Sequence, residues 1–128
     1  MSTRGAGAVT LRDLEATFIR AIPRPIPPCF HDIITAVVLD LQTHVAFADA
    51  HGVSFLCPGC FAKNGGAVGT HWIVVCFAGR DVPPDFLPGI HRWAFSGERI
   101  DNLTVTPSVL VVGGCAWHGF VQNGAIVG

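Results

Sequence analysis

The residues Cys57-Pro58-Gly59-Cys60 place two cysteines three positions apart around a proline and a glycine. Residues 53–56, which precede them, predict a strand that leads straight into this turn. Near the other end of the chain, Cys115-Ala116-Trp117-His118 repeats the spacing with a cysteine and a histidine. Two such turns allow four side chains to converge on one tetrahedral metal ion. The two stretches therefore predict a structural Zn²⁺ site formed by Cys57, Cys60, Cys115 and His118.

Four protein ligands fill the coordination sphere of zinc and leave no position for water, which favours a structural over a catalytic metal. His71 leaves an alternative open, because it begins a predicted strand eleven positions after Cys60. It could replace His118 as the fourth ligand or hydrogen-bond to one of the ligands. More often, a histidine in such a position is an ordinary strand residue.

The remaining nucleophilic side chains give a weaker signal. Cys29 follows a proline run and Cys76 lies in an apolar stretch, so both are expected to be small core residues. A hydrolase is conceivable in which Cys76 is the nucleophile, His71 or His91 is the base and Asp101 orients the base. The sequence contains no nucleophile elbow to support it. An enzymatic activity is therefore not expected.

Composition narrows the class of protein. The chain has 128 residues, which suits one domain. Hydrophobic residues make up 50% of it but charged residues only 13%, against about 25% in soluble domains. So few charges favour burial of part of the surface against other protein subunits, although a glycine- and proline-rich β-domain can also be low in charge. With a net charge of −1 and Lys63 as the only lysine, nucleic-acid binding is not expected.

The sequence also bears on location. Residues 1–10 contain no apolar segment of the kind found in signal peptides, and no run approaches 18 apolar residues. Secretion and insertion into a membrane are therefore not expected. Five cysteines are an odd number for a disulfide framework, and reduced thiols partly used for metal fit a cytosol better.

The N-terminal region predicts a helix and an arm. Thr10 precedes an acidic residue at a spacing that can cap a helix, and an apolar stripe follows at helical spacing. The stripe consists of Leu11, Leu14, Phe18 and Ile22. These features predict a short amphipathic helix over residues 11–21, which packs either in the core of the same domain or on a partner. Four prolines between residues 23 and 28 predict a stiff connector after it.

The rest of the chain predicts strands. Apolar, β-branched runs at residues 33–39, 53–56, 70–78, 92–95, 103–105 and 108–112 suit strands. Residues 120–127 predict a hairpin around Asn123-Gly124, a pair typical of type I′ turns. The expected fold is mainly β: a small zinc-ribbon-like domain over residues 31–128, preceded by a short helix and a proline-rich arm over residues 1–30.

Four stretches together resemble a family of small phage-encoded zinc-knuckle proteins without an established activity, some of which carry the label ammonia monooxygenase. The stretches are residues 55–61 (FLCPGCF), Arg92-Trp93, residues 103–109 (LTVTPSV) and residues 114–124 (GCAWHGFVQNG). They match a pattern of CPxC, tryptophan, T-x-SPS and C-x-x-H-x-F-x-x-x-G. The resemblance covers about residues 50–127 and implies a phage or prophage origin. It also implies zinc at Cys57, Cys60, Cys115 and His118.

These observations predict a non-enzymatic structural protein of phage type. The most concrete version is a head-associated, decoration-like virion component that docks onto other phage structural proteins, located in the virion or the host cytoplasm. One alternative is a zinc-ribbon adaptor that binds nucleic acid or a host protein. Another is a small metal-dependent hydrolase, which would require an open metal position in a cleft.

Overall fold

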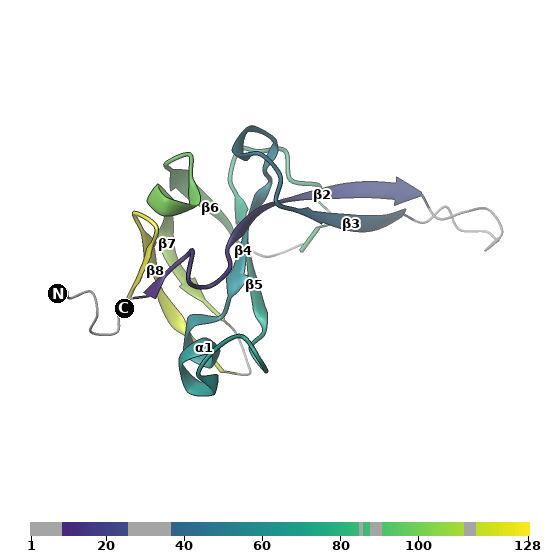
Figure 1. Ribbon diagram of the computed structural model, residues 1–128. Coiled ribbons are helices and arrows are strands. Elements are labelled where there is room, and N and C mark those ends of the chain that lie inside the picture. Colours follow the sequence, from purple (N-terminus) through teal and green to yellow (C-terminus); the bar gives the residue numbers. More distant parts are fainter. Residues whose placement is uncertain (1–8, 26–36, 85, 88–90, 112–114) are drawn as a thin grey trace.

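The computed structural model describes residues 9–25, 37–84, 86–87, 91–111 and 115–128. Within these residues the chain is mainly β, with one sheet of nine strands and one short α-helix (Figure 1). The strand order is β1-β9-β8-β7-β6-β5-β4-β2-β3, and neighbouring strands are antiparallel except β5 and β6. The prediction of a small, mainly β domain is confirmed.

Most of the described strands overlap the apolar runs of the sequence, but β1 and β2 were not expected, and the runs 103–105 and 108–112 form the single strand β7. In chain order they are β1 (Val9–Thr10), β2 (Thr17–Pro25), β3 (Val37–Thr43), β4 (Gly52–Leu56), β5 (Trp72–Phe77), β6 (Arg92–Ser96), β7 (Thr104–Leu110), β8 (His118–Gln122) and β9 (Ala125–Val127). The helix α1 (Pro58–Asn64) follows β4 directly. Two 3₁₀ turns, η3 (Phe47–Asp49) and η4 (Ile100–Asn102), lie in connections.

The segment expected to be a helix, residues 11–21, is instead a turn followed by β2. Thr10 and Asp13 do form the two reciprocal hydrogen bonds of a capping box, each 3.1 Å long, but these bonds close a single turn. From Thr17 the chain is extended and pairs with β4. The helix prediction is wrong because neighbouring strands supply hydrogen-bond partners for this backbone, which the spacing of apolar residues cannot reveal.

Residues 9–19 connect two distant parts of the sheet. β1 pairs with β9, and the N–H of Leu11 donates to the carbonyl of Gly124 at 2.8 Å. A few residues later, the carbonyl of Leu14 accepts the N–H of Leu56 in β4 at 3.0 Å. Leu11 and Leu14 are fully buried, and Phe18 is 8% exposed. Three of the four residues of the apolar stripe, Leu11, Leu14 and Phe18, therefore pack in the core of the domain itself, whereas Ile22 is only half-buried.

The core lies between the curved halves of the sheet. Its largest fully buried side chains are Phe55, Phe77, Leu11, Leu14, Ile19, Leu56, Leu103, Val53, Val75, Val105, Val109 and Val121. These side chains come from both the β4–β5 half and the β7–β8 half, so the two halves of the sheet share one hydrophobic core. Each Leu or Phe contributes about 1.5–3 kcal/mol by leaving water, before ordering costs.

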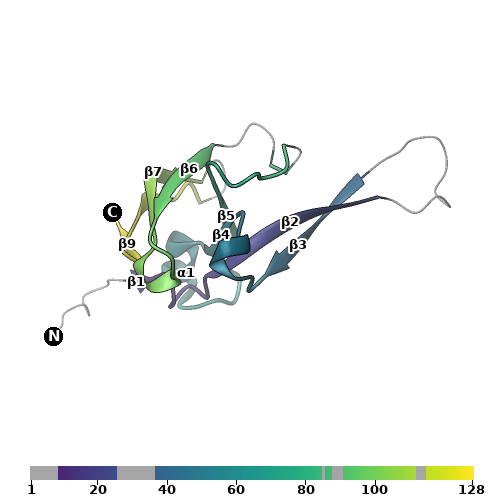
Figure 2. The ribbon, with the colours of Figure 1, turned by 90° about the horizontal axis from the view of Figure 1, so that it is seen from above.

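The β2–β3 ribbon extends away from the rest of the molecule in both views (Figures 1 and 2). β2 pairs with β4 only over Thr17–Ile19, whereas its pairing with β3 continues to Pro25. Pro23 and Pro25 thus lie where β2 has a single neighbour, the position in a sheet that tolerates proline. The expected stiff connector begins as a strand. Residues 26–36, which include Cys29 and the expected domain boundary, lie outside the described residues.

The C-terminal hairpin forms as predicted. β8 and β9 are antiparallel with Gln122 opposite Ala125, which leaves Asn123 and Gly124 as the two turn residues. Their φ angles are 51° and 78°, as a type I′ turn requires. This hairpin fixes the position of β8, which carries His118.

None of the helices within the described residues has the length and apolar character needed to span a membrane.

His51 is a buried polar residue at the start of β4. It is 4% exposed, and its Nδ1 accepts the backbone N–H of Ala21 at 3.1 Å. Burial, and then the positive charge of Arg20, lowers the pKa of His51 below its ordinary value. Between the pKa of His51 in the folded protein and its higher pKa in the unfolded chain, the unfolded chain binds a proton at His51 and the folded protein does not.

His51 should therefore make folding sensitive to mild acid. We expect its contribution to be fully present above about pH 6.5, the ordinary histidine pKa, and to be lost progressively below it. His51→Asn keeps an acceptor for the N–H of Ala21 and should show a smaller decrease in stability. Urea unfolding of both proteins between about pH 8 and pH 5 measures the difference. Equal pH dependence in the two proteins would contradict this account.

Candidate active site and metal centre

Cys57 and Cys60 lie at the junction of β4 and α1. Cys57 is the residue that precedes the helix, and Pro58 occupies the first helical position, where a missing N–H is harmless. The sulfur of Cys57 accepts hydrogen bonds from the backbone N–H groups of Cys60 and Gly59. The sequence Cys-Pro-Gly-Cys thus starts a helix whose first turn faces the Cys57 sulfur.

Strand pairing brings His71 to this turn. β4 and β5 are antiparallel, with Leu56 opposite Trp72, and the N–H of Cys57 donates to the carbonyl of His71 at 2.9 Å. Cys57, which follows β4, and His71, which precedes β5, therefore lie side by side. His71 is exposed, and its ring points towards the cysteines, with Nε2 at 3.4 Å from the sulfur of Cys115.

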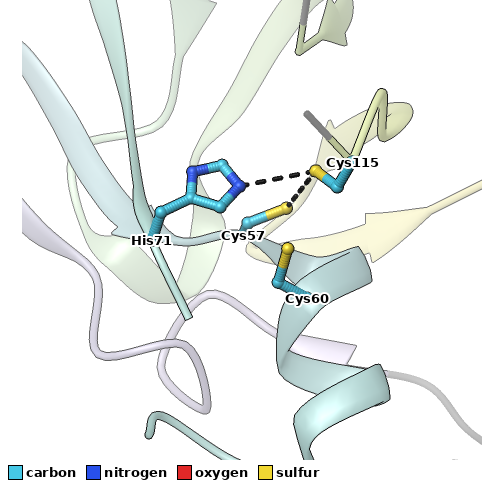
Figure 3. Close-up of side chains that lie close together, drawn as sticks. All are labelled: Cys57, Cys60, His71 and Cys115. Carbon is cyan, nitrogen blue, oxygen red and sulfur yellow. Dashed lines mark hydrogen bonds between the residues drawn. The ribbon is translucent and has the colours of Figure 1, made fainter. Parts of the chain in front are cut away.

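Cys115 completes a four-residue cluster (Figure 3). The potential ligand atoms of Cys57, Cys60, His71 and Cys115 all lie within 4.8 Å of one another. The sulfur of Cys115 is 3.4 Å from the sulfur of Cys57 and 3.4 Å from Nε2 of His71. Two sulfurs bonded at about 2.3 Å to one tetrahedral zinc ion lie roughly 3.8 Å apart. The donor set and its spacing suit a metal ion.

The protonation of the two closest thiols is asymmetric. Burial raises the pKa of Cys57 to about 11, whereas hydrogen bonding, first of all with His71, lowers the pKa of Cys115 to about 6. The two shifts favour a thiolate at Cys115 beside a thiol at Cys57. A bound cation would displace the Cys57 proton, because metal ligation requires the thiolate.

The structure places His118, the expected fourth ligand, in a different contact. Its Nε2 lies 2.7 Å from Oγ of Ser108, and the two side chains come from the adjacent strands β8 and β7. His71 takes the fourth position beside the three cysteines. The reason is the direction of β8: His118 starts the strand with its side chain exposed, whereas Gly119, the next residue, faces the core.

Ser108 and His118 share the outer face of the sheet. In β7, Val105 and Val109 are buried, Leu110 is exposed, and Ser108 immediately precedes Val109 and is half-buried. The pairing register shifts between Val105 and Val109, so the serine lies at a local irregularity of the strand. A serine hydroxyl at hydrogen-bonding distance from an imidazole is the pair used for nucleophilic catalysis.

Sequence reasoning missed Ser108. The only signal available was strand alternation: Val109 and Val121 are apolar and inward, which places Ser108 and His118 on the opposite face. The other conceivable hydrolase is not assembled. Cys76 is fully buried, and Asp101 accepts two hydrogen bonds of 2.9 Å from Arg12 on the surface.

Two cavities lie elsewhere on the described surface. The larger, of about 550 Å³, is lined mainly by residues of β2, η3 and the loop after β5, including Arg20, His51 and Arg80. The second, of about 450 Å³, lies over β2–β5 and includes Trp72. Neither is lined by Ser108, by His118 or by the cysteine cluster. The paired side chains on β7 and β8 therefore meet on an open sheet face rather than in one of these hollows.

The fold and the site define a small β-protein in which a cysteine-rich metal-type centre adjoins an exposed serine–histidine pair. A family model described as bacterial ubiquitination-like system serine protease (BubE) matches residues 32–127, which is 96 of the 128 residues. The chain belongs to this family. No curated protein and no solved structure gives a significant match.

Family membership corrects the functional expectation. The family is one of serine proteases, so the prediction of a non-enzymatic, capsid-associated virion component is wrong. Part of that prediction rested on an apolar N-terminal stripe free to dock on a partner. The structure buries Leu11, Leu14 and Phe18 in the core of the domain. The resemblance to phage-encoded knuckle proteins stays a prediction.

Proposed function

We propose that this chain is an active serine protease in which Ser108 is the nucleophile and His118 the general base. The observation that carries the proposal is the 2.7 Å contact between Ser108 Oγ and His118 Nε2. The family description, a serine protease, supports it independently. We further propose that the substrate is a peptide or isopeptide bond in a protein of a bacterial ubiquitination-like system.

The chemistry follows from the pair. The oxygen of Ser108 attacks the substrate carbonyl carbon while its proton passes to Nε2 of His118. The amide C–N bond then breaks, and His118 returns the proton to the departing amine. A water molecule, deprotonated by His118, releases the acyl group and restores the serine.

The metal centre has a structural role in this proposal. Cys57, Cys60, His71 and Cys115 make a closed Cys3His set of the kind that zinc occupies in structural sites. When bound, zinc would supply fixed geometry between α1, β5 and the segment before β8. Serine and histidine carry out bond cleavage, so an open metal position is not needed.

The surroundings of the pair favour a polypeptide as substrate. His118 is exposed, and its ring lies 6.4 Å from that of Phe120, which is 40% exposed. Leu110, directly opposite His118 across the strands, is 55% exposed. An open face with apolar side chains beside the reacting groups suits an extended chain that reaches across it, because backbone and side chains can both make contact.

A serine-directed probe tests the proposal before any substrate is known. A fluorophosphonate should form a covalent adduct on Ser108, because His118 assists loss of the hydroxyl proton. Peptide mass spectrometry locates the adduct, and Ser96, an exposed serine on the neighbouring strand β6, serves as an internal control. His118→Asn should reduce labelling of Ser108 by about 10²-fold or more. Equal labelling of Ser96 and Ser108 would argue against the proposal.

A further inference from the structure

Trp117 lies between the two centres in the sequence and in space. It is adjacent to His118 and two residues after the metal-centre residue Cys115. Its backbone N–H donates to the sulfur of Cys115, and its carbonyl accepts the N–H of Val111 at 2.8 Å. The backbone of this one residue thus joins the cysteine cluster to the end of β7.

The indole of Trp117 makes a second connection. A Cβ atom placed on Gly59, within the metal-binding turn, would lie 3.3 Å from Cβ and Cδ1 of Trp117. A Cβ atom on Gly119, in β8, would lie 2.5 Å from Cζ2 of the same ring. The indole therefore fills the space between the start of α1 and the inward face of β8, against two residues that have no side chain. It is half-buried and packs on the core.

The nucleophile is held by a separate contact. The carbonyl of Ser108 accepts the indole N–H of Trp93 at 3.1 Å, and Trp93 is only 7% exposed. The position of Ser108 is thus set within the β6–β7 part of the sheet. His118 lies in β8 between Trp117 and Gly119, and the ring of Trp117 packs against Gly119 and against Gly59 of the metal-binding turn.

We propose that Trp117 is a positioning residue through which the metal centre holds His118 at hydrogen-bonding distance from Ser108. This inference rests on the proposed function. Misplacement of a catalytic group by about 1 Å costs about 10²-fold in rate, so a rigid ring packed against the strand that carries the base has a measurable role. The protease would then depend on its metal although the metal does not touch the substrate.

Steady-state kinetics tests the role of the ring. Trp117→Ala should lower kcat by about 10²-fold, with KM changed by less than about twofold and metal content unchanged. Trp117→Phe, which keeps a flat ring, should recover most of the rate. Gly119→Ala should lower kcat in the same way, because its new methyl group would collide with the indole. Trp72→Ala, which removes an indole that is 51% exposed on β5, is the matched control and should retain kcat.

A readout that does not need activity separates this inference from the proposed function. The ring ¹⁵N resonances of His118, assigned with His118→Gln, should shift in Trp117→Ala and Gly119→Ala but not in Trp72→Ala. Unchanged His118 resonances in Trp117→Ala would overturn the inference, whether or not the wild type cleaves any substrate. Loss of metal from Trp117→Ala in parallel with activity would also overturn it, because the ring would then only support the metal-binding turn. Shifted resonances with metal retained would support it.

Discussion

Ser108→Ala should abolish hydrolysis while leaving the fold and the metal centre intact. The hydroxyl group of Ser108 lies 2.7 Å from His118 and is the atom that would form the acyl bond. Removing the nucleophile of a serine protease lowers kcat by about 10⁴–10⁶-fold. We expect kcat/KM to decrease to the background rate, measured with a fluorogenic peptide amide that the wild type cleaves.

The stability of this variant is the necessary control. Ser108 is half-buried on the outer face of β7, so its truncation should change the free energy of unfolding by less than about 1 kcal/mol. Ser96→Ala, on the neighbouring strand β6, is a matched substitution that should leave kcat/KM unchanged. Retention of more than about a tenth of the activity by folded Ser108→Ala would show that another group is the nucleophile.

Loss of the metal should unfold much of the domain. Structural zinc in small domains contributes an apparent binding free energy of about 10–16 kcal/mol, which is also folding free energy. Cys57 is fully buried at the junction of β4 and α1, and the cluster ties that junction to β5 and to the segment before β8. We expect Cys57→Ser to purify without metal, if at all, and to lose its cooperative unfolding transition. Elemental analysis and circular dichroism measure both effects.

Two histidine variants distinguish the ligand set. His71→Ala should lose most of the metal, because Nε2 of His71 lies 3.4 Å from the Cys115 sulfur. His118→Ala should retain one equivalent of metal and lose activity instead. If His118→Ala loses the metal and His71→Ala retains it, the ligand set expected from the paired turns is correct and the arrangement in Figure 3 is not.

The low charge of this chain, with 13% of its residues charged, favours from the sequence alone the interpretation that part of its surface is buried against other subunits. Part of the apolar content that supported this interpretation, notably Leu11 and Leu14, is buried inside the domain. Other apolar side chains, including Leu110 and Phe120, remain exposed around the serine–histidine pair. Apolar surface on a small protein can thus belong to a site for a polypeptide substrate.

Local sequence determined much of this protein. The strand before Cys57 and the type I′ turn at Asn123-Gly124 were predictable, because each depends on residues close together in the chain. Three of the four residues of the metal cluster, Cys57, Cys60 and Cys115, were predictable for the same reason. The spacing of residues and the turn-forming residues are sufficient to predict a local structure whose hydrogen bonds join residues close together in the chain. The helix that begins at Pro58 was not predicted: the expectation there was a tight turn followed by a loop.

Only the tertiary structure decided the role of the two histidines and the path of the N-terminal segment. His71 joins the cysteines because β4 and β5 pair with Leu56 opposite Trp72, and His118 meets Ser108 because β7 and β8 are neighbours. Residues 11–21 are not helical because β4 and β9 supply partners for the backbone on either side of the turn. Each outcome depends on which strands pair and in which register, and the local sequence does not set either of these. A shift of one residue in that register would turn each side chain to the opposite face of the sheet.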